Sequence, residues 1–95
     1  CYDTLSDGTA GGVEPGAITF DVCQEVVDRS LLVSEDAIAK SMKMFMEKHR
    51  MMIEGAAGVA LAGFQQVADD YAGKRVAIII CGANISLEKL SGVIQ

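Results

Sequence analysis

The feature that most constrains the fold is a run of five apolar residues at positions 76–80, three of which are isoleucine. The run lacks polar alternation, which predicts a β-strand buried on both faces, as in parallel sheets. It ends at a turn of small residues, Cys81-Gly82-Ala83-Asn84. Open α/β sheets bind ligands at the carboxyl edge of their strands, so Cys81, at the tip of this strand, is a candidate site residue.

Apolar spacing and capping residues predict the other elements. Ser34 is expected to cap a helix whose first turn holds Glu35 and Asp36, and Gly73 is expected to end another helix. We expect helices at 17–28, from Ser34 to about 49, at 54–71 and from about 87, with strands at 30–33 and 76–80. This order, helix-strand-helix-helix-strand-helix, predicts an α/β fold, a partial three-layer sheet fragment.

Residues 1–16 hold four of the ten glycines and the only proline, which predicts a loop or arm. Either it is a frayed terminus, or it is a segment ordered by something outside this chain. The chain starts at Cys1 without an initiator methionine, so we expect residues 1–95 to be a single fragment of a longer protein.

Composition excludes several classes of function. Thirteen acidic against eight basic residues give a net charge of −5, which argues against nucleic-acid binding. The longest apolar run, 55–64, is too short to span a bilayer. The three cysteines at positions 1, 23 and 81 lack metal-ligand spacing, so we expect reduced thiols, no metal site and a cytoplasmic protein.

Few side chains are candidates for chemistry, and each has a structural alternative. Cys81 is either a site residue or a buried structural thiol. Glu54 is either a functional carboxylate or an acid that favours the start of a helix. Asn84 either caps the last helix or lines the same turn as Cys81, and His49 is expected to be an exposed cation at a helix end. The sequence holds no glycine-rich dinucleotide or phosphate-binding motif.

Four stretches together resemble one family: TLSDGTAGG at 4–12, LVSEDAI at 32–38, MIEGAAGVA at 52–60 and ICGANI at 80–85. In order and spacing they resemble the C-terminal third of the catalytic region of threonine/serine dehydratases, which are fold-type II pyridoxal-phosphate enzymes. The resemblance implies that Cys81 faces the pyridine nitrogen of the cofactor. It also implies that Gly8 lies in a turn close to the cofactor and that Glu54 lies at a helix start near it. Gly55, where many members have proline, and Ala83, where glycine is commoner, depart from the family pattern.

The resemblance implies an amino-acid ammonia-lyase that converts a β-hydroxy amino acid to a 2-oxo acid and ammonia. The lysine that carries the cofactor and the phosphate-binding loop lie upstream in the family, so this chain is expected to hold no catalytic residue and to be inactive alone. The alternative is a non-catalytic, self-associating α/β module. In either case two short strands cannot form a sheet whose faces and edges are all protected, so we expect a homo-oligomer.

Overall fold

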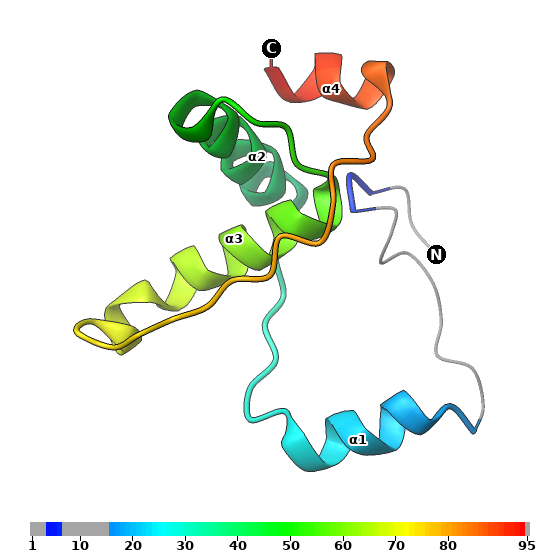
Figure 1. Cartoon of the computed structure of the whole chain (residues 1–95), viewed down its shortest axis with the longest axis vertical. Coiled ribbons are helices and arrows are strands. Elements are labelled where there is room, and N and C mark those ends of the chain that lie inside the picture. The colour runs from blue at the N-terminus through cyan, green and yellow to red at the C-terminus, as the bar shows by residue number, and fades with distance from the viewer. Residues whose placement is uncertain (1–3, 7–15, 95) are drawn as a thin grey trace.

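The computed structural model describes residues 4–6 and 16–94, in which helices joined by irregular segments are the only regular elements (Figure 1). The elements are α1 (Ile18–Val26), α2 (Glu35–His49), α3 (Gly55–Val67), the 3-10 helix η2 (Ala68–Tyr71) and α4 (Leu87–Ile94). The helices α2, α3 and α4 gather at one end, and α1 contacts none of them. None of these helices is long and apolar enough to cross a membrane.

All four predicted helices are confirmed, because local signals determine their ends. The Ser34 hydroxyl accepts a hydrogen bond from the Ala37 amide at 3.1 Å, which is the predicted cap of α2. The predicted helix at 54–71 is present as α3 followed directly by η2. Gly73 has a φ of +79°, in the left-handed region that glycine adopts most readily, and the chain reverses there.

The predicted strands are wrong, and with them the α/β partial three-layer sheet. No strand is present in residues 4–6 or 16–94, and positions 30–33 and 76–80 run without ladder hydrogen bonds. A strand needs a neighbouring strand to pair its backbone groups, and the described residues supply none. The apolar run therefore lies largely in solvent, with Ile79 73% exposed instead of buried.

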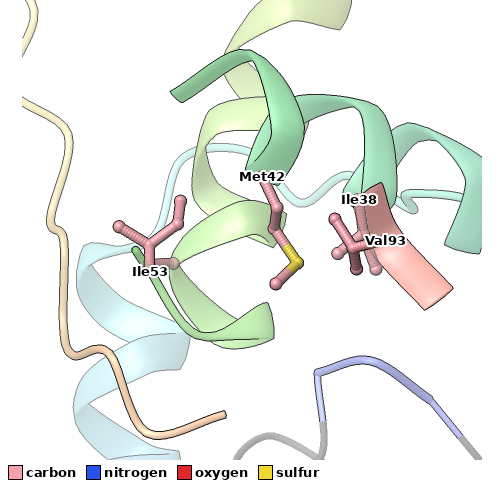
Figure 2. Packing of buried hydrophobic residues seen from close by; sticks show 5 residues of the cluster. Ile38, Met42, Ile53 and Val93 are labelled. Carbon is pink, nitrogen blue, oxygen red and sulfur yellow. The ribbon is translucent and has the colours of Figure 1, made fainter. Parts of the chain in front are cut away.

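A small apolar core joins α2, α3 and α4. Figure 2 shows Met42 of α2 packed between Ile53, just before α3, and Val93 of α4. The small residues of α3 allow α2 to approach closely, because a Cβ on Gly58 would lie 2.7 Å from the Met42 Cγ. Ile38 and Met42 are buried, and Phe45 and Met46 are partly buried against the same core.

Residues 4–6 cover the start of α3. The Leu5 amide donates to the Glu35 carboxylate at 3.1 Å, and the Lys89 ammonium donates to the Thr4 carbonyl at 3.2 Å. Ser6 is buried, and a Cβ on Gly55 would overlap the Leu5 carbonyl oxygen. This part of the predicted loop or arm at 1–16 is therefore packed against the helices.

The helix α1 buries none of its residues. Just beyond it, Arg29 makes an exposed ion pair with Asp70 of η2, with 3.0 Å between Nη1 and Oδ2. The hydrogen bond to Asp70 raises the pKa of the Arg29 guanidinium above its ordinary value. Because both side chains are exposed, solvent screens this pair and it contributes little to stability.

Candidate functional site

Glu54 and the turn at 81–84 meet at the start of α3. Glu54 is the residue that precedes α3, but its carboxylate makes no capping hydrogen bond to that helix. Instead Oε2 accepts a hydrogen bond from the backbone amide of Asn84 at 3.2 Å. Oε1 accepts a hydrogen bond from the Cys81 thiol at a sulfur–oxygen distance of 3.8 Å. The Glu54 amide in turn donates to the Gly82 carbonyl at 2.9 Å. Three contacts therefore tie the turn to one residue.

The absence of a side chain at position 82 permits this arrangement. A Cβ on Gly82 would lie 3.0 Å from Glu54 Oε2 and 3.1 Å from its Cδ, closer than such atoms ordinarily approach. Glu54 is half-buried beside the turn, whereas Cys81 and Ala83 are exposed. A thiol and a carboxylate are thus held together at an open surface, where Cys81 is accessible and is not the buried structural thiol of the alternative interpretation.

The structure also shows where Asn84 and His49 lie. The Ser86 hydroxyl caps α4, because it accepts a hydrogen bond from the Lys89 backbone amide at 3.2 Å. The backbone amide of Asn84 donates to the Glu54 carboxylate. His49 is exposed at the end of α2, and its ring lies 4.7 Å from that of Phe45. Gly8 lies outside the described residues.

A concave region separate from this site lies between residues 4–6, the start of α2 and α4. It has a volume of about 530 Å³, and its lining includes Glu35, Glu88 and Lys89. Neither Cys81 nor Glu54 is among its lining residues. In the described part of the chain, no three histidine, cysteine or acidic side chains are grouped as metal ligands would be.

The chain has clear relatives. The family model described as "Pyridoxal-phosphate dependent enzyme" matches residues 2–82, which is most of the chain. The chain therefore belongs to the pyridoxal-phosphate dependent enzyme family. No solved structure matches it significantly.

Among curated proteins, the chain is 32% identical over 92 residues to an L-threo-3-hydroxyaspartate ammonia-lyase of Pseudomonas sp, covering 97% of this chain and 28% of that protein. It is 35% identical over 92 residues to an L-threonine ammonia-lyase of Thermotoga maritima, covering 97% of this chain and 22% of that protein. It is 34% identical over 95 residues to a serine racemase of Dictyostelium discoideum, covering 98% and 29%. The chain thus spans less than a third of the length of each of these relatives.

The turn at 81–84 has the chemistry to contact one edge of a cofactor ring. Cys81 and Ala83 are small and exposed, and Gly82 has no side chain, so a flat ring meets little obstruction from the turn itself. The thiol is a hydrogen-bonding group that can face a ring nitrogen. The residues present therefore fit the nitrogen edge of pyridoxal phosphate.

Proposed function

We propose that this chain is the C-terminal part of the catalytic region of an amino-acid ammonia-lyase. The reaction eliminates water from a β-hydroxy amino acid, and hydrolysis of the elimination product then yields a 2-oxo acid and ammonia. The observation that supports this most strongly is the similarity to two ammonia-lyases over 97% of the chain. The substrate class is a small β-hydroxy amino acid, since threonine and 3-hydroxyaspartate occur in the names of those relatives.

In this proposal the site residues bind and orient. Bound pyridoxal phosphate supplies an electron-withdrawing ring, which makes the α-proton of the amino acid acidic. The Cys81 sulfur, whose hydrogen is directed at Glu54 Oε1 3.8 Å away, is proposed to face the ring nitrogen as a short, neutral group. Gly8 is proposed to pass close to the cofactor through its backbone, where a side chain would obstruct the approach.

Ammonia release by the full-length protein tests this function. We expect the protein loaded with pyridoxal phosphate to release equal amounts of ammonia and 2-oxo acid from threonine, serine or 3-hydroxyaspartate. The 95-residue chain alone is the control and is expected to be inactive, because the family's cofactor-binding lysine lies upstream. Cofactor binding without turnover of any of the three amino acids would contradict the proposal and favour a non-catalytic module.

We further propose that the chain forms homo-oligomers and works in the reducing cytoplasm. Self-association is supported by the apolar run at 76–80, where Val76, Ile79 and Ile80 are 45%, 73% and 41% exposed and no ladder covers the backbone. Unpaired apolar segments of this kind pair readily with a second chain. The exposed thiols of Cys23 and Cys81, unpaired in the structure, suit a reducing compartment.

Sedimentation equilibrium checks the self-association of the 95-residue chain. We expect dimers or larger species at micromolar concentration, and a shift towards monomer in Ile79→Lys, because a charge on the apolar run opposes pairing. Leu87→Lys is the matched control, since Leu87 is 83% exposed but lies in α4. A monomeric wild-type chain, or equal effects of both substitutions, would contradict pairing through 76–80.

A further inference from the structure

We propose that α1 of one copy of the chain docks on the apolar run at 76–80 of a second copy. The inference rests on the proposed self-association and names the element that covers the run. In a symmetric dimer the contact forms twice, because each copy supplies one helix and one run. The exposed apolar side chains of both segments are then removed from water, which drives the association.

Within the described residues 4–6 and 16–94, α1 has little to stabilise it. It has nine residues, no side-chain capping hydrogen bond and no buried residue. It also contacts no other helix. A helix this short is marginal in water unless its apolar face packs against a partner. The helix α1 therefore needs a surface that its own copy does not provide in those ranges.

The helix α1 offers an exposed apolar surface with a hollow beside it. Ile18, Val22 and Val26 recur at every fourth position, as on one face of a helix, and all three are exposed. The same helix borders a hollow of about 440 Å³, lined by Phe20, Cys23, Gln24, Val27 and Ser30. The hollow is large enough for an isoleucine side chain, and the run presents Ile79 and Ile80 in exposed positions. Burial of these side chains favours the contact.

Charge complementarity favours the run as the partner of α1. The helix and the two residues after it hold the acids Asp21, Glu25 and Asp28 and no base. The run follows directly on two exposed bases, Lys74 and Arg75, and contains no acid. Near the C-terminal end of α1 the helix dipole favours positive charge, which the bases of the second copy supply. Two α1 helices packed on each other would instead bring like charges together.

The chain that leaves α1 is held away from its own run. Arg29 pairs with Asp70 of η2, and the side-chain amide of Gln66 donates to the Leu32 carbonyl at 2.9 Å. These contacts hold the segment that follows α1 against η2 and α3. Figure 1 shows α1 apart from the segment that returns after η2. The helix is thus presented to a second copy.

Sedimentation equilibrium of the 95-residue chain tests the role of α1. We expect Phe20→Lys to raise the dissociation constant of the oligomer by about tenfold or more, because a charge replaces an apolar side chain that lines the hollow. Ile94→Lys is the matched control: Ile94 and Phe20 are 54% and 48% exposed, but Ile94 lies in α4. The control should associate as the wild-type chain does.

Charge reversal tests whether the helix and the run belong to different copies. The first variant carries Asp21→Lys and Glu25→Lys on α1, and the second carries Lys74→Glu and Arg75→Glu before the run. Each variant alone should associate about tenfold or more weakly than the wild-type chain, because like charges then face each other across the contact. An equimolar mixture should regain the wild-type affinity, since each helix of a mixed dimer then meets a run of opposite charge. Recovery in the mixture also shows that both variants fold.

Net charge alone predicts a different result. The first variant brings the net charge of −5 closer to zero, which by itself favours association. Glu47→Lys combined with Asp69→Lys is the matched control, because it changes the net charge equally at exposed positions outside α1. We expect this control to associate at least as strongly as the wild-type chain.

Unchanged association of Phe20→Lys, or no recovery in the mixture, would overturn the docking of α1. Weakening by only one of the two charge-reversed variants would also overturn it, because the contact would then join two helices or two runs. A monomeric wild-type chain contradicts the self-association and this inference together. An oligomer that is insensitive to substitutions on α1 contradicts this inference alone, and ammonia release by the full-length protein is tested separately from both.

Discussion

Gly55→Ala should displace residues 4–6 from the start of α3 and lower the free energy of unfolding by about 1–3 kcal/mol, as overpacking of a tight contact does. The added Cβ would overlap the Leu5 carbonyl oxygen and would also lie close to the Ser6 amide. Both are backbone atoms, so no side-chain rotation relieves the overlap. The hydrogen bond of Leu5 with Glu35 and the burial of Ser6 would be lost together.

Urea unfolding followed by circular dichroism measures this effect, with Gly92→Ala as the matched control. Gly92 also lies in a helix, α4, but a Cβ there has no neighbour within 4 Å. The control should be unchanged or more stable by about 0.5–1 kcal/mol, because alanine favours a helix more than glycine does. Equal stabilities of Gly55→Ala and the wild-type chain would show that residues 4–6 do not pack on α3 as described.

Cys81→Asp should reduce the turnover of the full-length enzyme by about tenfold or more, which corresponds to roughly 1.4 kcal/mol of barrier. The aspartate would place a second carboxylate beside Glu54, whose Oε1 lies 3.8 Å from the present sulfur. Two like charges at this separation repel, and an acid at the ring nitrogen would also hold a proton there that a thiol does not. Cys81→Ser is the matched control: its hydroxyl is short and neutral and can still donate to Glu54, so most activity should remain.

Local sequence signals were sufficient for the helices but not for the apolar run. Ser34 caps α2, and Gly73 lies just after the end of η2. Both features depend on interactions within a few residues, so the sequence alone predicts them. The run at 76–80 has strong strand propensity, but propensity does not provide a partner strand. Whether such a segment enters a sheet depends on chain that is not part of these 95 residues, and here it remains unpaired.

Cys81 and Glu54 can be chosen as candidates from the sequence one by one, but the contact between them cannot be predicted from it. Cys81 follows from its place after an apolar run, and Glu54 from its place before a helix of small residues. Their contact joins positions 27 residues apart, and it depends on how the chain returns from η2 to the start of α3. The periodicity of apolar side chains does not predict the path of the chain between η2 and the start of α3. The sequence feature that indicates the contact is Gly82, since a turn residue without a Cβ permits the close approach of a neighbouring side chain.

The most direct test of a cofactor-facing Cys81 is the rate of ammonia release per molecule of bound pyridoxal phosphate, measured on the full-length enzyme and its two Cys81 variants. Normalising to bound cofactor removes effects of folding and of loading. We predict that Cys81→Ser retains most of the parental rate and that Cys81→Asp loses about tenfold or more. A Cys81→Asp enzyme that folds, binds the cofactor and turns over at the parental rate would contradict a place for Cys81 at the cofactor.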